Sequence, residues 1–114
     1  LIKGCFTHGS SNGITEGWKL NCLMRWMKQN DADIYGYAHV HDYIPKSFTR
    51  LGTGENRITN KVAIGATTGA WFRTYTQGTE ASYGEQKSYP PNELCCAMFA
   101  INPNTGFLDV SRSV

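Results

Sequence analysis

The sequence predicts an α/β fold, in which a strand–helix–strand unit is followed by short antiparallel strands. Two observations support this fold class. A helical pattern of apolar residues lies between two short apolar runs near the start of the chain, and β-prone runs separated by turn residues follow it. The 114 residues, 40% of them hydrophobic, suit one domain with its own core over residues 1–114.

The first part of the chain is typical of a βαβ unit. Ile2–Thr7 is expected to be a short buried strand, Trp18–Gln29 a helix that Thr15 caps and Asn30 ends, and Ala32–Ala38 a second buried strand. Apolar residues recur along the helix at helical spacing: Leu20, Leu23, Met24 and Met27. Its exposed side is expected to carry three basic residues: Lys19, Arg25 and Lys28. A βαβ crossover makes the two strands parallel neighbours, so their carboxyl ends meet at one edge of the sheet.

The rest of the chain is expected to form an antiparallel meander that completes the sheet. Its predicted strands are Tyr43–Thr49, Arg57–Ala66, Ala70–Tyr75, Leu94–Ile101 and Phe107–Val110. Turn residues separate them, in the segments 52–54, 68–69, 90–92 and 102–106. The chain has no internal repeat and no linker that would divide it into two domains.

All three histidines of the chain follow the two predicted strands of the βαβ unit. His8 comes directly after the first strand, and His39 and His41 come directly after the second. Imidazole is the commonest protein ligand for transition metals, and open α/β sheets bind ligands at the carboxyl ends of their strands. The pattern therefore predicts a metal site. In an extended stretch His39 and His41 would face the same way, whereas a loop can turn them toward two neighbouring metals. Asp42 is expected to orient a ligating histidine or to cap the turn.

Together these motifs resemble the C-terminal half of a calcineurin-like metallophosphoesterase, in the version of phage and bacterial members. The resemblance rests on Thr7-His8-Gly9, Lys19-Leu20-Asn21 after a glycine-rich loop, Asp33-Ile34-Tyr35, and Ala38-His39-Val40-His41-Asp42. Further similar segments are Thr68–Tyr75, Ser82-Tyr83 and Tyr89-Pro90-Pro91, so most of the chain is covered. The sharpest motif of the family is Gly-His-x-His, and Ala38 replaces its glycine here.

The resemblance implies the C-terminal part of a four-layer α/β/β/α sandwich and a site for two divalent metal ions, Mn, Zn, Fe or Mg. It implies that His8 and His39 ligate one metal and that His41 ligates the other. It also implies a hydrolase of phosphomonoesters or phosphodiesters, nucleic acid among them. Arg73 could bind a substrate phosphate through its bidentate fork, although a solvated arginine on a strand is the simpler interpretation.

The family's earlier motifs, Asp-x-His, Gly-Asp-x-x-Asp and Gly-Asn-His-Asp/Glu, do not occur in this chain. We therefore expect a fragment of a longer enzyme that is inactive alone and that self-associates through an uncovered apolar face. Two alternatives stay open. One is a non-catalytic metal-binding or structural half-domain. The other is a nucleic-acid-binding domain, which only scattered basic residues support.

Composition sets further limits. The net charge of +2 does not by itself indicate a nucleic-acid partner, and no apolar run is long enough to span a membrane. Four cysteines, Cys5, Cys22, Cys95 and Cys96, lack the spacing of a disulfide framework, so we expect free thiols and a cytoplasmic location. A mixed zinc site of Cys5 with the three histidines is the alternative to free Cys5.

Overall fold

The computed structural model describes residues 1–10, 13–70 and 94–113. Their elements are one helix, α1 (Glu16–Gln29), and seven strands. The strands are β1 (Gly4–Thr7), β2 (Ile34–Tyr37), β3 (Pro45–Gly54), β4 (Arg57–Thr67), β5 (Gly69–Ala70), β6 (Cys95–Asn102) and β7 (Phe107–Ser113). Among these described residues, no helix is long and apolar enough to cross a membrane.

The first sheet confirms the predicted βαβ unit. Its strand order is β1-β2-β4-β3, with β1 parallel to β2, β2 parallel to β4, and β3 antiparallel to β4. The strand β2 is central and buried throughout, as the apolar run 32–38 predicts. The strand β1 lies at the sheet edge, so the prediction of a buried first strand is wrong: Phe6 is 64% exposed.

The helix α1 packs on one face of this sheet. Its residues Leu23 and Met27 are fully buried, and a Cβ on Gly65 of β4 would lie 2.8 Å from the Met27 sulfur. The absence of a side chain at Gly65 therefore lets the helix approach the sheet closely. The rest of this core comprises Ala32, Tyr35, Tyr37, Val40 and Ala63.

The helix ends are closed by side chains. The hydroxyl of Thr15 accepts from the Trp18 amide at 3.3 Å, which confirms the predicted N-cap. At the other end, Arg50 donates to the carbonyls of Met27 and Asn30, both at 2.6 Å. A cation at this end also complements the helix dipole.

Removing the N-cap hydroxyl is expected to weaken the helix. The change Thr15→Ala deletes the acceptor for the Trp18 amide and should lower the free energy of unfolding by about 1 kcal/mol in a urea titration. The matched change Thr15→Ser keeps the hydroxyl and should cost little. Equal losses for the two variants would show that the cap does not stabilise α1.

The tail differs from the expected single meander. The hairpin β3–β4 joins the first sheet, whereas β5, β6 and β7 form a second, antiparallel sheet. The chain leaves the first sheet at Gly69, where φ is +88° and a Cβ would lie 2.4 Å from the Cys95 carbonyl oxygen. Only glycine fits such a position, so the crossing between the sheets occurs there.

Two predicted boundaries also differ. The strand β3 continues through Gly52 and Gly54, which the sequence placed in a turn, and the hairpin turns at residues 55–56, where Asn56 has a φ of 59°. Asparagine tolerates this left-handed conformation. Of the predicted strand Ala70–Tyr75, only Ala70 falls in the described part.

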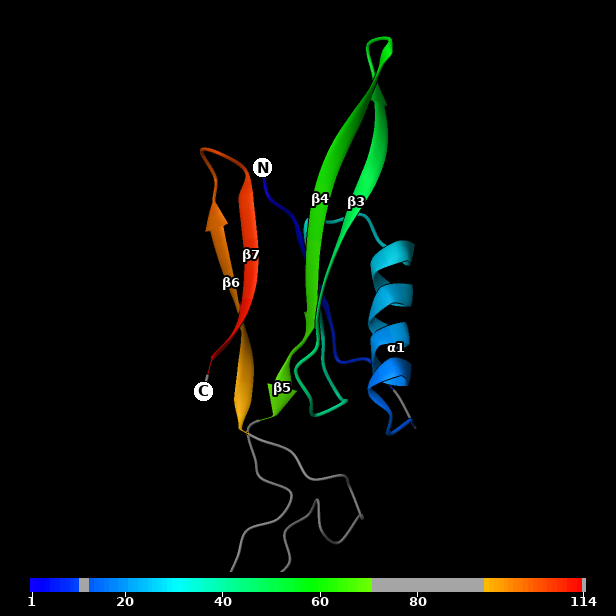
Figure 1. Cartoon of the computed structure of the whole chain (residues 1–114), viewed down its shortest axis with the longest axis vertical. Coiled ribbons are helices and arrows are strands. Elements are labelled where there is room, and N and C mark those ends of the chain that lie inside the picture. Colours follow the sequence, from blue (N-terminus) through cyan, green and yellow to red (C-terminus); the bar gives the residue numbers. More distant parts are fainter. Residues whose placement is uncertain (11–12, 71–93, 114) are drawn as a thin grey trace, which may run out of the picture.

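The second sheet covers the face of the first sheet opposite α1, which gives the layer order helix, sheet, sheet (Figure 1). Phe6 of β1 meets Phe99 of β6 edge to face, with ring centroids 6.4 Å apart. A Cβ on Gly36 of β2 would lie 2.4 Å from the Phe6 ring, so this glycine makes room for the contact between the sheets.

Candidate metal centre

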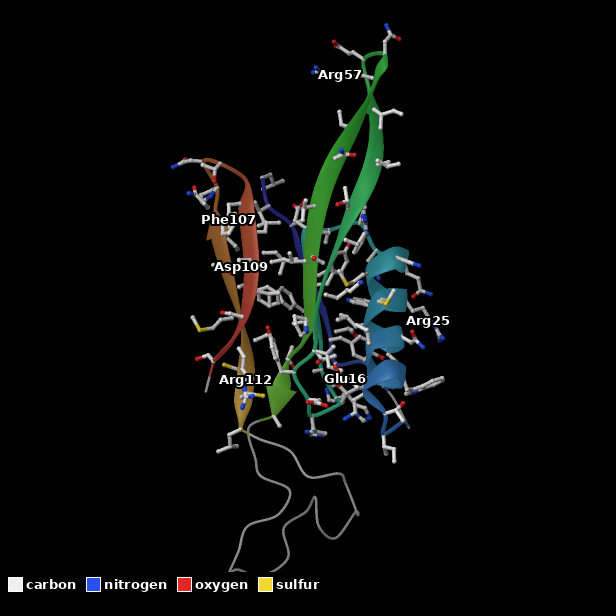
Figure 2. The ribbon with its side chains drawn as sticks, in the orientation of Figure 1. Glu16, Arg25, Arg57, Phe107, Asp109 and Arg112 are labelled. Carbon is white, nitrogen blue, oxygen red and sulfur yellow. The ribbon has the colours of Figure 1, made fainter. Side chains whose placement is uncertain are left out.

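The parallel pairing of β1 with β2 brings the three histidines to one edge of the first sheet. Thr7 and Tyr37, the last residues of the two strands, are register partners, and the Ala38 amide donates to the Thr7 carbonyl at 3.1 Å. His8 and the segment 39–41 therefore leave their strands at the same level. The same edge holds the start of α1, which Glu16 marks in Figure 2. The crossover thus brings the histidines together, as the sequence predicts.

His8 and His39 are in direct contact. The Nδ1 atom of His39 lies 3.2 Å from Nε2 of His8, and their ring centroids are 5.2 Å apart. The ring of His41 lies farther away, with its centroid 6.4 Å from that of His39. Two nitrogen ligands of one tetrahedral zinc ion lie roughly 3.3 Å apart, given zinc–nitrogen bonds of about 2.0–2.1 Å. The contact between His8 and His39 matches this spacing.

The loop that carries the histidine pair has an unusual backbone. His39 has a φ of 77° and His41 a φ of 54°, whereas Val40 between them is buried in the core. Left-handed conformations are uncommon for residues other than glycine and persist only where the surrounding structure holds them. Here the burial of Val40 anchors the loop and leaves both imidazoles partly exposed at the sheet edge.

Thr67, at the end of β4, holds the far side of this loop. Its fully buried hydroxyl donates to the Asp42 carbonyl and accepts from the Ile44 amide, both at 2.7 Å. The Gly69 amide donates to the same Asp42 carbonyl at 2.9 Å. These bonds fix the exit of the histidine loop to the neighbouring parallel strand.

Tyr37 holds the loop that follows His8. Its hydroxyl accepts from the Ser10 amide at 2.9 Å and donates to the Ser10 carbonyl at 2.7 Å. Gly9 has a φ of +72°, and a Cβ there would lie 2.4 Å from the Tyr37 ring. The backbone on the C-terminal side of His8 therefore packs against a buried tyrosine and forms hydrogen bonds with it.

Removing the Tyr37 hydroxyl is expected to destabilise the loop that follows His8. The change Tyr37→Phe deletes both bonds to Ser10 and should lower the free energy of unfolding by about 1–2 kcal/mol in a urea titration. It should also weaken binding of Mn²⁺ several-fold, because His8 is then less well positioned. The change Tyr43→Phe is the matched control. Equal effects on stability and metal affinity in the two variants would contradict this role of Tyr37.

Lys19 and Asp42 form an ion pair beside the histidines. The prediction that Lys19 lies on the exposed side of the helix is wrong, because Lys19 is only 8% exposed and its Nζ lies 3.3 Å from Oδ2 of Asp42. The carboxylate on the histidine loop compensates for the burial of this cation. The other oxygen of Asp42 accepts from the Tyr43 amide at 3.0 Å.

The surroundings of His41 favour its neutral form. Burial lowers the pKa of His41, and the neighbouring His39, Lys19 and His8 lower it further through charge repulsion. Neutral imidazole is the form that coordinates a metal. Burial and the neighbouring cationic groups therefore favour the form of His41 that a metal ion requires.

The described residues do not supply a complete set of ligands. Within residues 1–10, 13–70 and 94–113, no group of three or more histidine, cysteine or acidic side chains is placed to hold a metal ion. Cys5 packs against the hydrophobic core, and all four cysteines are free. Arg73, the predicted phosphate contact, lies outside the described residues.

Sequence reasoning missed the residues that hold the site in place. Tyr37, Thr67 and Lys19 carry no metal-binding chemistry, and their contacts join segments far apart in the chain. One signal was available, because Tyr37 ends the strand that precedes the histidine pair and a buried tyrosine needs a partner for its hydroxyl.

Comparison of the chain with protein-family models, with curated proteins and with solved structures gives no match.

Proposed function

We propose that this chain is part of a metal-dependent phosphoesterase and that its histidines form half of a dinuclear metal site. The contact of 3.2 Å between Nδ1 of His39 and Nε2 of His8 carries the proposal. Two neutral imidazoles can share a proton at this distance, but two ligands of one ion also take this spacing. The left-handed backbone at His39 and His41 supports a functional role for the loop.

The arrangement of layers supports the same proposal. The order helix, sheet, sheet fits three layers of the four-layer sandwich of calcineurin-like metallophosphoesterases, whose C-terminal part the sequence resembles. In this proposal His8 and His39 bind one divalent ion and His41 binds the second, with Mn, Zn, Fe or Mg as the metals. Such a pair of ions, when bound, supplies an activated water and stabilises the charge on the phosphoryl oxygens.

The residues of the chain fit this role in part. Three imidazoles do not neutralise two divalent ions, so carboxylates are required to balance the charge. Asp42 already binds Lys19 and the Tyr43 amide, which suits it to positioning the histidine loop. We infer that the bridging carboxylate lies outside residues 1–10, 13–70 and 94–113.

The proposed substrate is a phosphate ester, either a phosphomonoester or a phosphodiester, with nucleic acid as one candidate. The test is turnover of bis(4-nitrophenyl) phosphate and 4-nitrophenyl phosphate with Mn²⁺, by the longest protein that the reading frame around this chain encodes. We expect hydrolysis that a His8→Ala, His39→Ala double variant lacks. A longer protein that binds metal but hydrolyses neither ester with any of the four metals would contradict the proposal.

A second candidate function is a non-catalytic metal-binding or structural half-domain. It is favoured by the lack of a third metal-binding donor beside His8 and His39 among the described residues. A reading frame that encodes no acidic metal-binding motif before Leu1 would favour this module. For both functions we propose a reducing, cytoplasmic location, in keeping with the four free cysteines.

A further inference from the structure

A cavity of about 430 Å³ lies between α1 and the loop that follows β1. Thr7 and Gly9, the two neighbours of His8 in the chain, line it on one side. On the other side, α1 contributes Trp18, Cys22, Trp26 and Gln29, which recur at helical spacing on one stripe of the helix. The cavity therefore lies beside the chain segment that carries His8, and its volume is that of a small-molecule site (about 300–1,000 Å³).

The walls of the cavity combine flat aromatic surfaces with groups that can form hydrogen bonds. Trp18 and Trp26 supply two indole rings, whereas Arg25 and Gln29 supply side-chain donors and an amide acceptor. Arg25 projects from the same helix in Figure 2. Indole and guanidinium planes stack on heteroaromatic rings, and an amide reads the edge of such a ring. This composition differs from that of a simple aliphatic pocket.

One wall carries a hydrogen-bond donor that lacks a partner. The indole nitrogen Nε1 of Trp26 is buried and has no acceptor within the part of the chain that the structure describes. A buried N–H without an acceptor is costly, and native structures seldom leave one unsatisfied. Trp26 lines the cavity, but its Nε1 atom is buried, so the other atoms of its side chain form the surface that a ligand meets.

The opposite wall is held in place before any ligand binds. The Tyr37 ring lies under Gly9, and its hydroxyl bonds both backbone groups of Ser10. On the helix side, Trp18 packs closely against Gly13, where a Cβ would lie 1.8 Å from its ring. Preorganised walls reduce the entropy that a ligand loses on binding.

We propose that this cavity binds the nucleobase of a nucleotide or nucleic acid, stacked on indole and hydrogen-bonded at its edge. The inference deepens the proposed function, because it makes the substrate a phosphate ester that carries a base next to His8. Base binding itself needs no metal. Absence of nucleoside binding would therefore contradict this proposal alone, and absence of hydrolysis would contradict the proposed function alone.

The test is calorimetric titration of the full chain with adenosine, guanosine, cytidine and uridine in a buffer that contains a metal chelator. We expect at least one nucleoside to bind and ribose to give no heat. Trp18→Ala should weaken binding at least about tenfold through loss of stacking. Trp26→Ala should weaken it about threefold to tenfold, because it removes the second indole surface of the cavity. Circular dichroism checks that each variant is folded.

Two controls separate this cavity from the metal centre and from non-specific binding. Lys28→Ala alters an exposed residue of α1 that does not line the cavity, and it should leave the affinity unchanged. The double variant His8→Ala, His39→Ala should retain nucleoside binding even though it loses metal. The proposal is overturned if no nucleoside binds at millimolar concentration, or if folded Trp18→Ala and Trp26→Ala bind as the natural chain does.

Discussion

Replacement of His39 by alanine is expected to lower the affinity of the chain for Mn²⁺ or Zn²⁺ by more than about 100-fold. In the proposed site His39 shares an ion with His8, whose Nε2 lies 3.2 Å from Nδ1 of His39, so loss of His39 leaves a single imidazole. Loss of a residue that hydrogen-bonds to a metal ligand already lowers the affinity for the metal about 10–100-fold. Loss of one of two direct ligands should therefore have the larger effect. Calorimetric titration of the natural and variant chains measures it.

The change His41→Ala is the matched comparison. The ring of His41 lies 6.4 Å from that of His39, so the proposal assigns it to the second ion. We expect His41→Ala to retain binding of the first ion within about tenfold, in contrast to His39→Ala. Equal losses in the two variants would contradict the division of the histidines between two ions.

Within the ion pair between Lys19 and Asp42, replacing Asp42 should lower the free energy of unfolding more than replacing Lys19. The change Asp42→Asn removes the partner of a lysine whose side chain is only 10% exposed. Breaking a buried pair in this way costs about 3–5 kcal/mol. Asp42 itself is 46% exposed, and solvent screening reduces the effect, so we expect a loss of about 2 kcal/mol in the free energy of unfolding. Urea titration measures it.

The reverse change, Lys19→Met, removes the buried cation instead. It leaves a half-exposed carboxylate that water can solvate, so the expected loss is below about 1 kcal/mol. In the double variant, Asp42→Asn should add little to Lys19→Met, because no buried charge remains. If Asp42→Asn alone costs less than about 0.5 kcal/mol, Lys19 does not depend on this carboxylate.

Local patterns in the sequence were sufficient to predict the βαβ unit. The spacing of Leu23 and Met27, the cap at Thr15 and the buried run 34–37 all depend on near neighbours in the chain. Parallel pairing then follows from the crossover, and it brings His8 to His39. The position of the histidines was therefore predictable although 31 residues separate His8 from His39.

Features that depend on long-range packing were not predictable in this way. Gly69 resembles any turn glycine in the sequence, yet the Cys95 carbonyl beside it marks the crossing into a second sheet. Lys19 fits a solvated helix face until the loop that carries Asp42 packs over it. The exposure of Phe6 depends on β1 being an edge strand, which strand order alone determines.

The most direct test of the central claim is calorimetric titration of the folded chain with Mn²⁺ and with Zn²⁺, beside the variant in which His8, His39 and His41 are all alanine. We expect saturable binding by the natural chain and no binding by the variant, with both chains folded by circular dichroism. Equal binding by the two chains, or no binding of either metal by the folded natural chain, would contradict the claim that these histidines form a metal site.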